Sequence, residues 1–350
     1  MHRISGHKKK MKGKNYLVTW MYSSGMGEKI VHHQSGSSDK LKTQNLYWRC
    51  VFCLFESSYR NNKDLFTHIL YVNKFPPETI DGIPTDDLIK KYNIDIRLFP
   101  VRSLPPKGFY KAWSSQFLLL DIFEEIVQFI KADDRLLILD SDCIFSKPVS
   151  SDFLTDIDTH RGLLYTIDYP VDKPGNGLST RMLRAMATEM TGRNSDGVFY
   201  EGGEFICMKG ELLPEFSRTA RDVFNWSLLR YSKGLPKYNT EEHTFCVVYW
   251  LLGLSPFTGN KYIKRLWTDM SSSVNIEPGD DQRLIWHLPA EKNKGFIRYF
   301  RILGMNNYSL KGFERDLSSI FRVKPTLGDR LAMYAKIPLK KTYRLLKAMG

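Results

Sequence analysis

The 350-residue sequence has no apolar run long enough to cross a bilayer, which takes about 20 residues. Its longest apolar stretch, residues 245–254, predicts a buried helix instead. No repeat or low-complexity tract is visible. Residues 1–14 are rich in lysine but lack the continuous apolar region and small-residue cleavage site of a signal peptide, so they read as a flexible basic arm. We therefore expect a globular protein that remains in the cytoplasm.

Cysteine is scarce, with five residues that lie mostly in apolar runs and form no zinc-type array. Such cysteines are typical of reduced core residues in a reducing compartment. Cys50 and Cys53 do form a C-x-x-C pair. A redox or metal role would need a suitable environment or further ligands. The surrounding residues 48–55 resemble an apolar helix, which favours core packing.

Acidic residues are outnumbered, because 51 Lys and Arg stand against 38 Asp and Glu and give a net charge of +13. The expected partners are therefore anionic: phosphorylated small molecules, an acidic lipid surface or nucleic acid. Much of the basic excess lies in the two terminal segments rather than on one face of the fold. We therefore expect no nucleic-acid partner. A hydrophobic content of 42% is ample for one large α/β domain or two smaller ones.

Apolar segments with strand character alternate along the chain with segments of helical pattern. Strands separated by helices predict an α/β fold with a mixed, mostly parallel sheet flanked by helices. The predicted strands are 16–22, 66–72, 94–101, 136–139, 162–167, 198–208 and 284–287. The predicted helices are 43–60, 86–92, 110–131, 151–156, 179–190, 212–231 and a last one that opens at 238–243 and runs through residue 250.

The most informative segment is the buried-looking strand 136–139, which ends in Asp140 and Asp142. In open α/β sheets, ligands bind in the crevice outside the carboxyl ends of the strands. A straight strand would place the two aspartates on one face, where they repel each other unless a cation lies between them. The segment therefore predicts a metal site. The alternative is a solvated turn at the end of the strand.

Two further segments suggest a functional site, and for each of them a structural explanation is also open. Gly202 and Gly203 interrupt a strand pattern, which indicates close approach by a ligand or another backbone, or a β-bulge. Glu241 and Glu242 follow Thr240 at the start of a helix, where an N-cap and the helix dipole would by themselves explain two acidic residues.

Two loops complete the set of candidate segments. His287 precedes Lys292 and Lys294, two lysines that could meet phosphates. The proline- and glycine-rich loop 170–177 could close over a substrate. We further expect nucleotide contacts from Thr19, Tyr22, Asn73 and Lys111.

The segment Leu-Ile-Leu-Asp-Ser-Asp-Cys-Ile-Phe resembles the Asp-x-Asp strand of nucleotide-sugar glycosyltransferases with the GT-A fold. Four segments, 140–142, 201–203, 240–242 and 287–295, are similar in order to the motifs of the glycogenin and bacterial lipopolysaccharide galactosyltransferase type. Glu201 and Glu241 replace amides of those motifs, Thr240 replaces an acid, and the last loop lacks the Pro-Trp ending. The resemblance covers roughly residues 15–300, a GT-A domain followed by a basic extension over 301–350.

This resemblance implies a bound Mn²⁺ or Mg²⁺ held by Asp140 and Asp142, with His287 as the third protein ligand. Lys292 or Lys294 would contact the diphosphate of the donor, together with Asp140. The implied donor is a nucleotide sugar, most simply a UDP-sugar, whose leaving diphosphate the metal stabilises as a Lewis acid.

The resemblance also implies two candidate catalytic carboxylates. Glu242 matches an acidic position that lines the donor sugar and the acceptor. Glu204 is the competing candidate for a base that deprotonates an acceptor hydroxyl, which an inverting enzyme requires.

Residues 324–350 combine apolar positions at near-helical spacing with seven basic residues and one acid. A basic amphipathic segment is typical of a membrane-surface anchor, attracted by anionic lipids at about 1 kcal/mol per basic residue. The alternative is a helix packed on the core with a solvated basic face.

We therefore predict a metal-dependent hexosyltransferase-type enzyme acting on a hydroxyl of a surface-glycan precursor of the capsule or lipopolysaccharide kind. A lipid-linked acceptor would place it at the inner membrane face. The alternatives are a nucleotidyltransferase acting on sugar phosphates, disfavoured because no glycine-rich, lysine-bearing loop follows the first strand, and a non-enzymatic nucleic-acid-binding protein.

Overall fold

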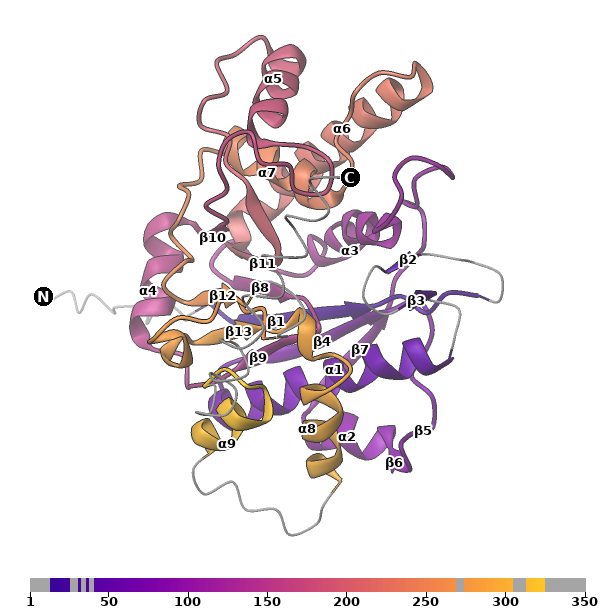
Figure 1. Cartoon of the computed structure of the whole chain (residues 1–350), viewed down its shortest axis with the longest axis vertical. Helices are drawn as coiled ribbons and strands as arrows, with labels where there is room; N and C mark the ends of the chain where they lie inside the picture. The colour runs from indigo at the N-terminus through magenta and orange to yellow at the C-terminus, as the bar shows by residue number, and fades with distance from the viewer. Residues whose placement is uncertain are drawn as a thin grey trace, which may run out of the picture.

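A six-stranded mixed sheet forms the centre of the computed structural model, which describes residues 13–25, 31–32, 36–37, 41–268, 274–304 and 313–324 (Figure 1). From edge to edge its strands are β10 (Gly162–Thr166), β11 (Glu201–Lys209), β8 (Arg135–Leu139), β1 (Asn15–Met21), β4 (Thr67–Val72) and β7 (Ile94–Leu98). Strands β8, β1, β4 and β7 pair in parallel, and β11 runs antiparallel to both β8 and β10. The predicted mostly parallel α/β sheet is confirmed.

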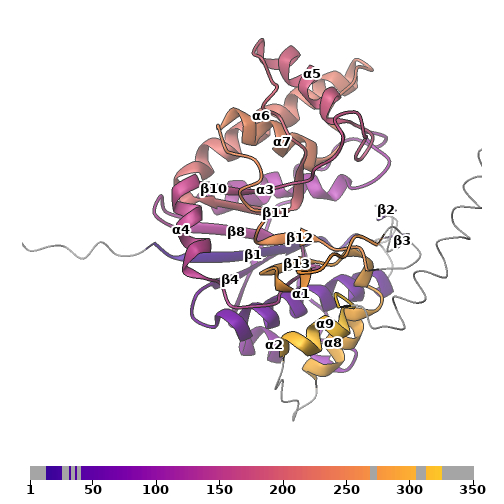
Figure 2. The same ribbon diagram turned by 60° about the vertical axis from the view of Figure 1, so that its left-hand side comes forward.

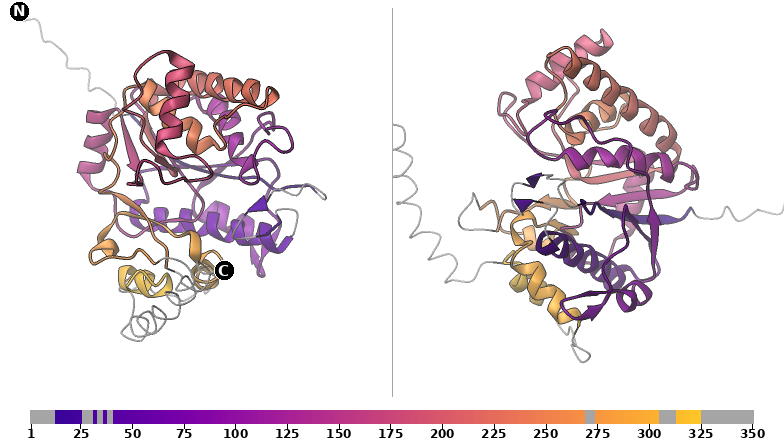
Figure 3. Two further views of the ribbon diagram at one scale, coloured as in Figure 1. Left: turned by 45° about the horizontal axis from the view of Figure 1, so that its top comes forward. Right: turned by 90° about the vertical axis from the view of Figure 1, so that its right-hand side faces the viewer.

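Helices cover both faces of this sheet (Figure 3). One group comprises α1 (Leu41–Asn62), α4 (Ser151–His160), α8 (Gly295–Leu303) and α9 (Phe313–Ile320). The opposite group comprises α3 (Leu119–Ile126), α5 (Thr180–Thr191), α6 (Leu213–Ser232) and α7 (Glu241–Leu251). The short helix α2 (Thr85–Lys91) lies beside β7.

The residues of β8 show why a central strand is apolar along its whole length. Leu137 and Leu139 belong to the core beneath α1, whereas Leu136 and Ile138 belong to the core beneath α3 and α6. Side chains of a strand alternate between faces, so a strand covered on both sides needs apolar residues at every position. The apolar run ends together with β8 at Leu139, directly before Asp140.

A second, three-stranded sheet lies against the first, on the side of α8 and α9 (Figure 2). It consists of β12 (Ile263–Arg265), β13 (Ile285–His287) and β9 (Cys143–Phe145). In its register His287 pairs with Cys143 on one side and with Arg265 on the other. Three segments far apart in the sequence thereby meet at the end of β8.

The remaining regular elements are short. Two ladders of two-residue strands pair β2 (Val31–His32) with β3 (Gly36–Ser37) and β5 (Thr79–Ile80) with β6 (Ile83–Pro84). Short 3₁₀ helices span Ser114–Leu118, Gly210–Leu212, Asp280–Gln282 and Pro289–Glu291. Among the described residues, no helix combines the length and the apolar character needed to cross a membrane.

Four predicted elements differ from the structure by three residues or more at one end. The helix expected over 151–156 continues to His160 as α4. The helix expected over 110–131 is interrupted because Trp113 adopts a left-handed backbone conformation (φ 63°), so a 3₁₀ turn and the shorter α3 replace it. The strand expected over 94–101 ends at Leu98, and the strand expected over 198–208 begins at Glu201.

Parts of both terminal regions lie outside the described residues. Residues 1–12 and 325–350, which include most of the predicted basic arm and most of the predicted membrane anchor, lie outside the described residues. Helix α8 runs from Gly295 to Leu303 and so spans residue 300, the predicted end of the GT-A domain. Leu317 and Phe321 of the next segment are fully buried in the core. Cys50 and Cys53 are free and buried in α1, as their apolar surroundings predicted.

Candidate functional site

The two aspartates of the Asp-x-Asp segment lie on a turn that directly follows β8. The backbone N–H of Cys143 donates to the carbonyl of Asp140 (3.0 Å), and β9 begins at Cys143. The strand thus ends at Leu139 as predicted, and the aspartates lie on the turn that follows rather than on a straight continuation of the strand. The turn nevertheless brings both carboxylates to the same side, as predicted.

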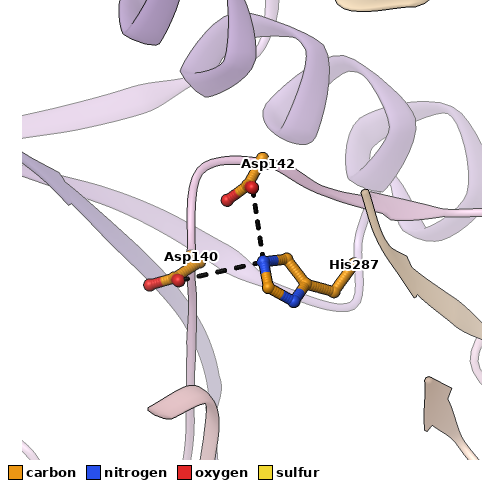
Figure 4. A group of neighbouring side chains, drawn as sticks. All are labelled: Asp140, Asp142 and His287. Carbon is orange, nitrogen blue, oxygen red and sulfur yellow. Dashed lines mark ion pairs between the residues drawn. The ribbon is translucent and has the colours of Figure 1, made fainter. Parts of the chain in front are cut away.

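His287 reaches the aspartates through the pairing of β13 with β9. The backbone N–H of Leu288 donates to the carbonyl of Asp142 (2.9 Å) and fixes this register. The Nε2 atom of His287 lies 3.3 Å from Oδ2 of Asp142 and 4.0 Å from Oδ2 of Asp140 (Figure 4). One ligand atom from each of the three residues lies within 4.8 Å of the others. The structure thus brings the predicted metal ligands together.

The orientation of His287 is set by Glu204. The Nδ1–H of His287 donates to Oε1 of Glu204 (2.9 Å), which leaves Nε2 directed at the aspartates. A histidine held by a carboxylate on one nitrogen and directed at acidic groups by the other has the arrangement of a metal ligand with its supporting shell. Glu204 is held in turn by Arg265, whose Nε donates to Oε1 (2.7 Å).

These charges shift the ionisation of the site. Burial disfavours a charged His287, but Asp142 and Glu204 outweigh this effect and raise its pKa to about 9. Burial would raise the pKa of Asp142, yet Lys292 and His287 hold it well below its usual range. Burial and then Asp142 raise the pKa of Asp140 to about 6. A proton on His287 and the ammonium of Lys292, which bonds Asp142, thus offset the repulsion between the aspartates.

The candidate metal cluster forms one side of a pocket of about 370 Å³. Its size and its mixture of apolar surface with a few converging polar groups are typical of a small-molecule site. Six partly exposed aromatic side chains line it: Trp20, Tyr22, Tyr47, Trp113, Tyr169 and Trp267. Five carboxyl groups line it with three basic residues: Asp140, Asp142, Glu204, Glu241 and Glu242, with Arg265, His287 and Lys292.

The first turn of α7 supplies the acidic pair at another side of this pocket. Thr240 is the N-cap, whose hydroxyl accepts from the backbone N–H of His243, as the sequence predicted. Glu241 and Glu242 also line the pocket, so they face a possible ligand as well as the first turn of the helix. Oε2 of Glu242 accepts hydrogen bonds from the Tyr200 hydroxyl (2.9 Å) and from Nδ2 of Asn176 (2.9 Å).

Gly202 and Gly203 make room for these carboxylates. A Cβ atom on Gly202 would lie 2.5 Å from Oε2 of Glu204, and one on Gly203 would lie 3.2 Å from Oε1 of Glu241. The close approach that the glycine pair predicted is therefore made by side chains of the protein itself. The pairing of β11 with β10 is also irregular between Leu164 and Thr166.

Glu204 lies behind His287 rather than free in the pocket. Burial would raise its pKa, but Arg265 and His287 hold that pKa well below its usual range. A carboxylate bound on both sides by cations is a weak base. Of the two predicted catalytic carboxylates, Glu242 is therefore the better placed to act on a substrate.

Two of the predicted nucleotide contacts are tied to the backbone instead. Thr19 is fully buried, and its hydroxyl donates to the carbonyl of Leu139 (2.8 Å). The amide of Asn73 both accepts from the backbone N–H of Ser23 (2.7 Å) and donates to its carbonyl (3.0 Å). Neither lines the pocket. Their hydrogen bonds shape the ends of β8 and β1.

The other predicted contacts divide between the pocket and the surface. Tyr22 and Lys292 line the pocket. Lys111 is exposed beside the ring of Tyr110, and Lys294 is exposed; neither lines the pocket. Loop 170–177 contributes Gly175 and Asn176 to the wall of the pocket.

Sequence reasoning missed three residues that organise the site: Arg265, Tyr200 and Asn176. Arg265 lies on a three-residue strand, and its position beside His287 follows from strand pairing that no local pattern indicates. Tyr200 and Asn176 meet Glu242 from separate loops. The sequence signal available for Arg265 was its position, next to Lys264, between the apolar pairs 262–263 and 266–267.

Comparison of the sequence with models of known protein families gave no match, and no curated protein is significantly similar to it. The function must therefore be inferred from the site itself. Its distinguishing features are the Asp140–Asp142–His287 cluster and the carboxyl-rich, aromatic-lined pocket beside it.

We predict that Mn²⁺ affinity rises with pH. A histidine must be neutral to bind a metal, and in the metal-free protein the pKa of His287 is raised to about 9. Below that pH a proton must leave when the metal binds, so the apparent affinity should rise by up to about tenfold per pH unit and then level off. Calorimetric titration between pH 6.5 and 9.5, in buffers of different ionisation enthalpy, measures both affinity and proton release. An affinity independent of pH would contradict this role of His287.

Glu204→Gln should weaken Mn²⁺ binding by about 10–100-fold, because the group that orients His287 loses its charge. Glu211→Gln is the matched control, since Glu211 is an exposed carboxylate paired with Arg161 on the surface. Calorimetry gives the affinities, and circular dichroism verifies that both variants fold. Equal affinities in the two variants would show that Glu204 does not support the metal ligand.

Proposed function

We propose that this protein is a metal-dependent glycosyltransferase that transfers a sugar from a nucleotide-sugar donor to a hydroxyl group. The observation that carries the proposal is the convergence of Asp140, Asp142 and His287 at one side of a pocket of suitable size. The position of the aspartates after a central strand of a mostly parallel sheet supports a GT-A type of architecture.

The charge balance of the pocket supports a divalent cation. A diphosphate is strongly anionic, yet the carboxyl groups that line the pocket outnumber its basic residues. Without a cation the two would repel each other. Asp140, Asp142 and His287 offer the carboxylate and imidazole ligands that suit Mn²⁺ or Mg²⁺. When bound, the ion would offset the charge on the departing nucleoside diphosphate.

The residues around the cluster support the remaining tasks of such an enzyme. The ammonium of Lys292, which bonds Asp142, is near enough to turn toward a phosphate. The aromatic side chains of the pocket offer apolar faces to a base or a sugar ring. Glu242 is fixed by Tyr200 and Asn176 and would accept the proton of an attacking hydroxyl.

The acceptor that we propose is a surface-glycan precursor, with a lipid-linked form presented at the inner face of the membrane. The basic composition of residues 324–350 supports this choice. Liposome sedimentation with and without residues 325–350 separates this proposal from the enzymatic one. Equal pelleting would remove the membrane association and leave the glycosyltransferase proposal intact.

Asp142→Asn should lower metal-dependent hydrolysis of the nucleotide-sugar donor by at least about 100-fold. The reason is that a neutral amide binds a divalent cation much more weakly than a carboxylate does. Wild-type protein with Mn²⁺ is first screened against UDP-, GDP-, ADP- and CMP-sugars. Release of the nucleotide is then measured in the variant. Asp133→Asn, which changes an exposed aspartate, is the matched control.

Circular dichroism verifies the fold of both variants. Full activity of Asp142→Asn would contradict the proposed site. Release of pyrophosphate from nucleoside triphosphates and sugar phosphates, in place of nucleotide from nucleotide sugars, would indicate nucleotidyl transfer instead.

A further inference from the structure

The two consecutive glutamates of α7 have opposite surroundings. Glu242 bonds the Tyr200 hydroxyl, the Asn176 amide and, at 3.3 Å, Nη2 of Arg265. Oε2 of Glu241 is buried and has no hydrogen-bond partner in the described part of the chain, and the residue as a whole is only 6% exposed. A buried polar atom without a partner is costly, so such an atom in a pocket calls for an explanation in terms of a ligand.

Glu241 has the position that a ligand contact requires. It lines the pocket together with Asp140 and Gly203. Its Oε1 lies so near Gly203 that an added Cβ atom there would be 3.2 Å away. The glycine therefore gives Glu241 its space beside the strand that carries Glu204.

The surroundings of Glu241 also define its charge. No ion pair of Glu241 is found among the described residues; the charged groups that act on it are acidic, and the backbone N–H groups of Glu241 and Glu242 oppose them only in part. Burial, followed by Glu242 and Asp140, raises the pKa of Glu241 well above its usual range. A neutral carboxylic acid offers one O–H donor and one carbonyl acceptor. A hydroxyl group, which both donates and accepts, is its natural complement.

We propose that Glu241 binds a hydroxyl group of the donor's sugar through its unpartnered Oε2. The inference rests on the proposed function and names the chemistry of the substrate: a sugar that carries a hydroxyl at the contacted position. Glu241 and Glu242 have different roles because their contacts differ. Glu242 is bonded to Arg265, whereas Glu241 has no cation beside it among the described residues and carries the proton.

The test compares the binding of nucleoside diphosphates with the binding of their hexose conjugates in the presence of Mn²⁺. Calorimetry is run with UDP, UDP-glucose and UDP-galactose, and with GDP and GDP-mannose, on the full chain. Glu241→Ala should bind the nucleoside diphosphate within about twofold of wild type and the hexose conjugate at least about tenfold more weakly. Glu241→Gln keeps a donor and an acceptor and should bind both within about threefold of wild type.

The outcomes separate the inference from the proposed function. If Glu241→Ala binds every conjugate like wild type, Glu241 makes no contact with the sugar and the inference fails, while metal-dependent binding of the diphosphate still supports the function. If Glu241→Gln is as weak as Glu241→Ala, a charged carboxylate is needed and the neutral assignment fails. If wild type binds none of the diphosphates, the proposed function and the inference fall together.

A stability measurement excludes a merely structural role. Oε2 has no partner to lose, and the backbone N–H groups that act on the carboxyl belong to its own helix turn. Glu241→Ala should therefore keep its melting temperature within about 2 °C of wild type, whereas loss of a hydrogen bond that ties α7 to another element would lower it further. Glu78→Ala, at an exposed glutamate outside the pocket, is the control for loss of a glutamate side chain. A fall of more than about 5 °C in Glu241→Ala alone would assign the residue to the fold and overturn the inference.

Discussion

Repulsion between two neighbouring carboxylates is the constraint around which this site is arranged. Asp140 and Asp142 meet because β8 ends at Leu139 and the chain turns immediately. Buried like charges are costly unless cations lie near them. In the structure these are His287, brought by β13, and Lys292 from the following loop. A divalent cation offers a stronger compensation in the same position, which is why the metal site explains the arrangement better than a solvated turn does.

The same network ties the metal side of the pocket to the acidic side. His287 bonds Glu204, Glu204 bonds Arg265, and Arg265 reaches Glu242 at the start of α7. Each buried charge in this hydrogen-bonded network has an opposite charge beside it, and a pair held in this way is rigid. A ligand that binds at the aspartates therefore meets an acidic side of the pocket that is already ordered. The glycines of β11 keep the carboxylates close to the strand without a clash.

Local patterns predicted the parts of the site that lie on one segment, and long-range pairing placed the rest. The buried run of β8 and its terminal aspartates were evident, because burial on both faces leaves a continuous apolar stretch. His287 was expected only through a family resemblance, since its position depends on pairing with β9. Arg265 was missed for the same reason. Thr19 was expected to bind a nucleotide and instead bonds a backbone carbonyl, because polarity alone does not distinguish a ligand contact from a structural hydrogen bond.

Crystals of the full chain soaked in Mn²⁺ and examined by anomalous diffraction test the central claim most directly. The account predicts an anomalous peak coordinated by Asp140, Asp142 and Nε2 of His287, with the ammonium of Lys292 moved away from Asp142. Saturating Mn²⁺ with no peak at this position, and with the bond between Lys292 and Asp142 intact, would contradict it.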